Sequence, residues 1–178
     1  MASLTETETE SKKYLFIDDA PEYLRVYRKI LRDAGHTMEI IDNIGLGWVW
    51  IERHGPFELV LIDLALDRHF SEFGREYKEV REGLESYGHG ALFMTGQALG
   101  LRLWRRRKKI QQPYCYFTNF SQIWVENCNT GDPEFGGMMF EEAHDLGLVL
   151  NKSALWEGNM DQELRNIRQI WEDKEWLL

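Results

Sequence analysis

The chain has 178 residues and a formal net charge of −9, with 43% hydrophobic and 29% charged residues. This balance is typical of a globular protein with its own core, and the excess of acidic residues argues against general nucleic-acid binding. No apolar run approaches the ~18 residues of a membrane span, the polar start offers no signal peptide, and the two cysteines are too few for a disulfide framework. We therefore expect a cytoplasmic protein.

The first third of the chain alternates strands and helices with short turns, which predicts a parallel sheet covered by helices. Residues 1–12 repeat Thr and Glu and are expected to form a disordered tail, followed by a single domain over 13–178. The predicted strands here are 13–17, 36–42 and 58–63, and the predicted helices are 21–34 and 44–54.

The alternation is interrupted after residue 63. The stretch "EFGREYKEVREGLESY", 72–87, carries apolar residues at steps of three and four, which indicates an extra helix. Its apolar stripe serves either as a partner or dimer surface or as packing on the domain. The next helix, at about 97–110, contains the basic run "RRRKK", 105–109, interpreted as a solvated helix face, with docking of an acidic partner as the alternative. The remaining predicted elements are a strand at 111–119, a loop at 120–137, a helix at 138–146, a strand at 146–153 and a helix at 160–177.

Polar side chains stand where four of the predicted apolar strands end. Because the carboxyl ends of parallel strands meet at one edge of a sheet, we expect these side chains to converge. Carboxylates are suitable ligands for Mg²⁺, and a hydroxyl and an ammonium group can bind phosphoryl oxygens. The set therefore predicts a Mg²⁺-dependent site in which one carboxylate, on the central strand, is the nucleophile toward a phosphoryl group. The strand-end residues are Asp18, Asp19, Asp63, Thr118 and Lys152.

Four stretches resemble the receiver domain of two-component response regulators. "YLFIDDAPEYLRVYRKILRDAG" resembles the first strand, acidic pair and first helix of that family, and "PFELVLIDLAL" resembles its phosphoacceptor strand. "QQPYCYFTN" resembles its fourth strand, and "EEAHDLGLVLNKSAL" the stretch with its lysine. The resemblance implies a flavodoxin-like α/β fold, a doubly wound five-stranded parallel sheet of strand order 2-1-3-4-5. The extra helix follows strand 3, within the first of two insertions, at about 67–95 and 121–137.

The resemblance also implies roles for the strand-end residues. Asp63 would be the phosphoacceptor, assisted by the hydroxyl of Thr118 and the ammonium of Lys152. The Mg²⁺ ligands would be the carboxylates of Asp18, Asp19 and Asp63 and the backbone carbonyl of Ala65. Such a stand-alone phosphorelay domain is not an enzyme beyond its own phosphorylation and dephosphorylation. Its expected partners are a histidine kinase or histidine phosphotransfer protein, a downstream protein target and a possible second copy of itself, but no nucleic acid and no membrane.

Departures from the family pattern leave alternatives open. Thr95, in "ALFMTG", competes with Thr118 for the switch role, the usual Met-Pro turn after the acceptor is absent, and Ser153 replaces the proline that normally follows the lysine. A second hypothesis is therefore a receiver-like interaction module that works without phosphorylation. A haloacid-dehalogenase-like phosphatase is disfavoured, because that family needs an acid where this chain has Ala20.

Overall fold

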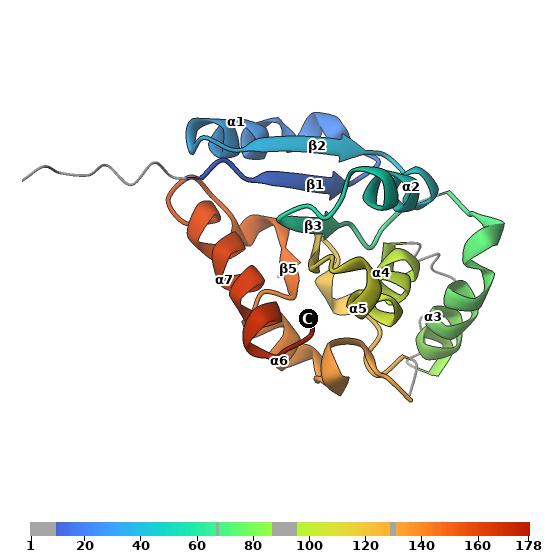
Figure 1. The fold of residues 1–178 in the computed structure, drawn as a ribbon. Coiled ribbons are helices and arrows are strands. Elements are labelled where there is room, and N and C mark those ends of the chain that lie inside the picture. Colours follow the sequence, from blue (N-terminus) through green and yellow to red (C-terminus); the bar gives the residue numbers. More distant parts are fainter. Residues whose placement is uncertain (1–9, 67, 87–95, 129–130) are drawn as a thin grey trace, which may run out of the picture.

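A five-stranded parallel sheet forms the centre of the molecule, with the strand order β2-β1-β3-β4-β5. The computed structural model describes residues 10–66, 68–86, 96–128 and 131–178, so most of the expected tail lies outside the described residues. This is the flavodoxin-like, doubly wound fold predicted from the sequence (Figure 1). The strands are β1 (Lys13–Ile17), β2 (Thr37–Ile41), β3 (Leu59–Ile62), β4 (Tyr114–Thr118) and β5 (Val149–Asn151).

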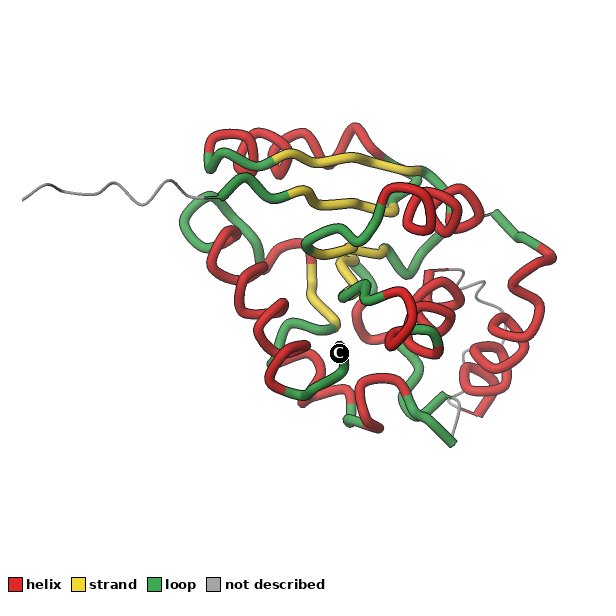
Figure 2. Tube along the Cα trace, in the orientation of Figure 1, coloured by secondary structure: helices red, strands yellow, loops and turns green. Residues whose placement is uncertain are grey.

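Helices connect the strands and cover the sheet (Figure 2). Every residue of β3 and β4 is buried, as expected for central strands of a parallel sheet with both faces covered. Among the helices that the structure describes, none combines the length and the hydrophobicity that crossing a bilayer requires. The helices are α1 (Arg25–Asp33), α2 (Ile44–His54), α3 (Gly74–Ser86), α4 (Gly96–Arg105), α5 (Arg107–Ile110), α6 (Phe140–Asp145) and α7 (Met160–Asp173).

Helix α7 passes the residues at which β2, β3 and β4 begin. Its indole and guanidinium groups donate hydrogen bonds to backbone carbonyls there, and its first turn meets a buried histidine. Figure 1 shows α7 beside the starts of β1 and β2, on the side away from their arrowheads. These contacts of α7 therefore lie at the amino ends of the strands, opposite the edge where the candidate site residues are expected. The contacts join Asp161 to His36, Arg168 to the carbonyl of Glu58, and Trp171 to the carbonyl of Tyr114.

The extra helix predicted after strand 3 is present as α3, preceded by a 3-10 turn at Ser71–Phe73. Its apolar stripe is buried against the rest of the protein, so the stripe packs on the domain and is not available as a partner surface. The buried residues of the stripe are Phe73, Tyr77, Val80 and Leu84.

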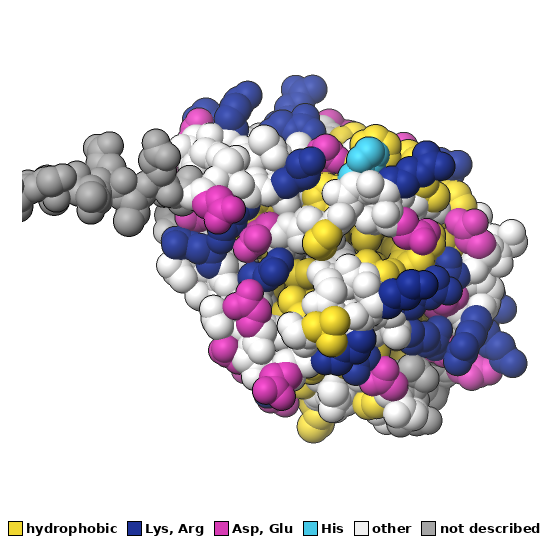
Figure 3. All heavy atoms as spheres, in the orientation of Figure 1, with side chains coloured by type: hydrophobic (Ala, Val, Ile, Leu, Met, Phe, Trp, Pro, Cys, Tyr) yellow, Lys and Arg dark blue, Asp and Glu magenta, His cyan; other side chains and the backbone are white. Residues whose placement is uncertain are grey.

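The basic run at 105–109 is exposed at three of its five positions, Arg106, Lys108 and Lys109, but its interpretation as a solvated face is wrong for the other two. The side chain of Arg105 is 15% exposed and pairs with Glu79 of α3. That of Arg107 is 17% exposed, donates to Asp132 at 2.8 Å, and stacks on an indole ring. The acidic partners lie far away in sequence, within the insertions, so local charge patterning could not identify them. Acidic and basic side chains are interspersed over the face of the molecule that Figure 3 draws.

The second insertion is attached to the sheet through a carboxylate that is 0% exposed, Glu134. It accepts hydrogen bonds from the hydroxyls of Tyr114 and Tyr116, from the indole Nε1 of Trp124 at 2.9 Å and from the amide of Gln97 at 3.2 Å. Burial raises its pKa even though these four donors favour the ionised form. The network joins the insertion to β4 and α4.

We predict that Glu134→Ala lowers the free energy of unfolding by about 3–5 kcal/mol, because four buried donors lose their acceptor. Urea denaturation followed by circular dichroism measures the loss. The matched control is Glu141→Ala, at an exposed position in α6, which should change stability by no more than about 0.5 kcal/mol. Equal effects of the two substitutions would refute a structural role for the network.

Candidate functional site

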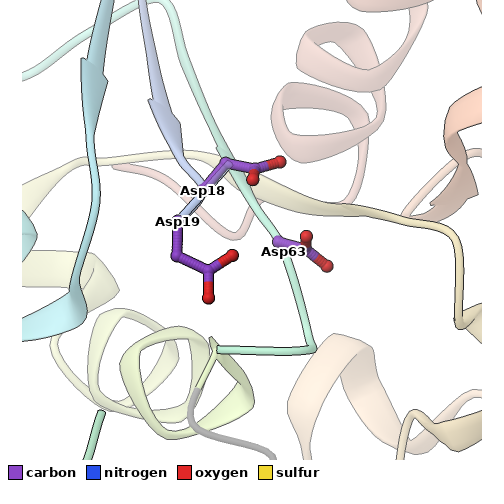
Figure 4. Close-up of side chains that lie close together, drawn as sticks. All are labelled: Asp18, Asp19 and Asp63. Carbon is purple, nitrogen blue, oxygen red and sulfur yellow. The ribbon is translucent and has the colours of Figure 1, made fainter. Parts of the chain in front are cut away.

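Three carboxylates meet where β1 and β3 end. The two strands are adjacent and parallel, with Ile17 opposite Ile62, so Asp18 and Asp63 follow paired residues. Each of Asp18, Asp19 and Asp63 offers a carboxylate oxygen that lies within 4.8 Å of the others, a grouping that could hold a metal ion (Figure 4). Asp18 and Asp63 are buried, whereas Asp19 is exposed. The convergence expected from the strand ends is therefore present for these three residues.

Lys152 extends its side chain into the same cluster. It opens a 3-10 turn directly after β5, and its Nζ lies 2.6 Å from Oδ2 of Asp18 and 3.1 Å from Oδ2 of Asp63. Only 11% of the side chain is exposed. The ammonium group thus bridges the two buried carboxylates.

Burial and pairing act against each other in this ion pair. Burial raises the pKa of Asp18, and the hydrogen bonds from Lys152 and from the backbone N–H of Ala20 do not fully offset it. Burial alone would lower the pKa of Lys152, but its hydrogen bonds and charge interactions with Asp18 and Asp63 leave that pKa raised. The ammonium is consequently charged at neutral pH, and ionised Asp18 retains a desolvation cost that an added cation would reduce.

Thr118 and Ala65 lie next to residues of this cluster, Thr118 beside the strand that precedes Lys152 and Ala65 beside Asp63. Thr118 is the last residue of β4, is fully buried and lies opposite Asn151, the residue before the lysine. Its Oγ1 accepts a hydrogen bond from the backbone N–H of Phe120 at 3.1 Å. The N–H of Ala65 donates to Oδ1 of Asp63 at 3.2 Å. The Ala65 carbonyl as a metal ligand and the switch role of Thr118 stay predictions, and the competing Thr95 lies outside the described residues.

Helix α4 approaches the acceptor strand closely, a contact that the sequence patterns did not predict. A Cβ atom at Gly96, the first residue of α4, would lie 1.7 Å from the backbone carbonyl oxygen of Asp63. Only glycine allows this contact, so the amino end of α4 is fixed against the backbone of the candidate nucleophile. The glycine itself was the only signal in the sequence, and many helices begin next to a glycine without any such contact.

No protein-family model matches the sequence, and no significant match is found among curated proteins. Solved structures are similar, among them the N-terminal domain of a response regulator/sensory box/GGDEF protein from Carboxydothermus hydrogenoformans, with 15% identity, a TM-score of 0.57 and coverage of 92% of this chain and 99% of that one. A CheY-like receiver domain from Methylobacillus flagellatus has 11% identity and a TM-score of 0.54, over 89% and 99% of the two chains. One from Methanospirillum hungatei has 17% identity and a TM-score of 0.52, over 93% and 99%.

The chain has the fold of a receiver domain. The strand order and helix arrangement match this receiver fold, and the sequence identities of 11% to 17% show the fold alone. The resemblance inferred from four short stretches of sequence is therefore confirmed at the level of the fold. The candidate site lies at the carboxyl ends of the strands, where open parallel sheets bind their ligands.

We predict that Lys152→Met lowers the free energy of unfolding by about 1–3 kcal/mol, because Asp18 and Asp63 remain buried without their ammonium partner. The loss should be larger at about pH 8 than at about pH 5. A carboxyl whose pKa is raised in the folded state costs stability when it ionises, and protonation at lower pH removes that cost.

Urea titrations at the two pH values measure this dependence. The control is Lys174→Met, at an exposed position after α7, which should leave stability unchanged at both. A deficit in Lys152→Met that grows as the pH falls would contradict the assignment of the cost to ionised carboxylates.

Proposed function

We propose that the protein is a receiver that accepts a phosphoryl group on Asp63 in a Mg²⁺-dependent reaction. The observation that carries this proposal is the meeting of three carboxylates and one ammonium group at the carboxyl edge of a receiver-fold sheet. These groups are the ones that a phosphoryl transfer to an aspartate needs: a nucleophile, ligands for a hard cation and a positive charge for the phosphoryl oxygens.

The donor set fits Mg²⁺, which prefers a few carboxylates and keeps open positions for water and phosphoryl oxygens. Asp18, Asp19, Asp63 and the Ala65 carbonyl would hold it, and when bound it supplies positive charge to the phosphoryl oxygens. An Asp63 oxygen attacks phosphorus, and the new O–P bond forms as the P–N bond of a phosphohistidine breaks. The departing imidazole, protonated on its other nitrogen, keeps the electron pair of that bond.

The remaining groups stabilise the acyl phosphate once it forms. The ammonium of Lys152 already lies 3.1 Å from Asp63 Oδ2, so it is placed to pair with the transferred group. The hydroxyl of Thr118 then turns from its present contact toward the phosphoryl oxygens and shifts the conformation of the adjoining loop. The amino end of α4, which lies against the Asp63 backbone, favours negative charge nearby.

The proposed phosphodonor is a histidine kinase or phosphotransfer protein in the cytoplasm, and the signal passes to a downstream protein or a second copy of this chain. Exposed apolar side chains next to the site support a protein partner. Val26, in α1, is 55% exposed, and Trp156, four residues after Lys152, is 58% exposed. We keep a phosphorylation-independent interaction module as the second candidate, because the usual turn after the acceptor is absent.

Acetyl phosphate separates the two candidates. With Mg²⁺ present, we expect intact-mass spectrometry to show one added phosphoryl group, as the P–O bond of the reagent breaks and acetate leaves. Asp63→Asn should abolish the increment, and Asp42→Asn, directly after the edge strand β2, should retain it. No increment in the unaltered protein would reject the phosphoacceptor function and favour the interaction module.

We also expect Mg²⁺ to bind the unphosphorylated protein through the acidic cluster. Asp19→Asn removes one of the three carboxylates and should weaken Mg²⁺ binding by about tenfold or more in isothermal titration calorimetry. Asp42→Asn again serves as the control and should bind as tightly as the unaltered protein. Equal affinities in all three proteins would place any Mg²⁺ elsewhere.

A further inference from the structure

The backbone of Lys152 is tied to helix α1 by the side chain of Tyr27. The hydroxyl of Tyr27 donates a hydrogen bond to the carbonyl oxygen of Lys152 at 3.0 Å, across 125 positions of sequence. Burial raises the pKa of Tyr27, so its hydroxyl keeps its proton and remains a donor at neutral pH. The same carbonyl also accepts a long hydrogen bond of 3.4 Å from the N–H of Leu155.

The ring of Tyr27 is itself held in place. It packs edge-to-face on Phe117, with ring centroids 5.1 Å apart and an interplanar angle of 82°. Phe117 in turn packs edge-to-face on Phe16 of β1, at 5.9 Å. Phe117 precedes Thr118, and Phe16 lies two residues before Asp18. The ring of Tyr27 thus packs on β4, which ends in Thr118, and Phe117 links it to β1, which Asp18 follows. Its hydroxyl therefore holds the lysine backbone in place relative to these strands.

Ser153 follows Lys152, and side-chain hydrogen bonds hold the turn that the two residues share. The side chain of Asn151 accepts hydrogen bonds from the N–H of Ser153 at 3.0 Å and from its hydroxyl at 2.8 Å. These bonds fix the conformation of the turn itself. Two side chains attach the turn to other elements. Asn159, before α7, donates to the carbonyl of Ala154 at 2.8 Å at the far end of the turn, and Tyr27 of α1 holds the carbonyl of Lys152 itself.

We infer that Tyr27 is a positioning residue for Lys152, which holds the lysine backbone so that its ammonium reaches Asp63. The inference rests on the proposed function for its effect on phosphoryl transfer, but not for its effect on the lysine. Tyr27→Phe removes the hydroxyl and keeps the ring on Phe117. Tyr23→Phe is the matched control, because it makes the same chemical change on the preceding turn at a side chain that is 73% exposed.

The first measurement requires no phosphorylation. The ¹³Cε signal of Lys152, assigned by its loss in Lys152→Met, should move or broaden in Tyr27→Phe and stay in place in Tyr23→Phe. An unchanged signal in Tyr27→Phe overturns the inference, whatever the rates show.

The second measurement is the rate of phosphorylation by acetyl phosphate at saturating Mg²⁺. Tyr27→Phe should lower the maximal rate by roughly threefold to tenfold, the range expected for one lost hydrogen bond, with the half-saturating Mg²⁺ concentration unchanged. A loss of structure would instead weaken Mg²⁺ binding as well. If the lysine signal moves and the rate does not fall, the positioning role in the reaction is rejected. If the unaltered protein takes no phosphoryl group while the signal moves, the proposed function fails and the attachment of Lys152 by Tyr27 stands.

Discussion

The ammonium group of Lys152 between Asp18 and Asp63 is the interaction on which the arrangement of the site depends. Strand β5, which presents the lysine, is separated from β3 by β4, so the lysine side chain has to reach across the end of β4 to touch the two acids. Thr118, the last residue of β4, is therefore located between the groups that this ion pair connects. The ion pair thereby connects the carboxyl ends of β1, β3 and β5, although β5 is adjacent to neither of the other two strands.

The two insertions are attached to this core by buried and half-buried carboxylates as well as by apolar packing. The first one, with α3, places Glu76 and Glu79 against arginines of α4, and the second one buries Glu134 among four donors. Breaking one partner of a buried charged contact is costly, so such contacts specify a single arrangement strongly. These contacts hold both insertions at defined positions on the domain.

Much of the fold and part of the site could be predicted from the sequence, because both depend on local patterns. An apolar run that stops at Asp63, and another that stops before Lys152, identify buried strands and the sheet edge at which their ends meet. The partners of Arg105 and Arg107 could not be predicted, since they come from segments whose place in space follows from the tertiary fold.

The burial of Glu134 could not be predicted for the same reason. An acid in a loop ordinarily faces water, and nothing in its neighbouring residues indicates that two tyrosines of β4 lie beside it. The contact of Tyr27 with the lysine backbone likewise joins two helix-and-strand units that are remote in sequence. Pairings of this type depend on which elements the topology brings together, not on the pattern within any one of them.

The contact between Gly96 and the residues that follow β3 has a consequence for how such domains can vary. A Cβ at Gly96 would also lie 3.1 Å from the Cα of Leu64, so the polypeptide comes back to the point it left before α4 begins. The segment between Leu64 and Gly96 begins and ends at the same place, so its length need not alter the spacing of the candidate site residues. The segment inserted at this junction can therefore change in length while the candidate site keeps its shape.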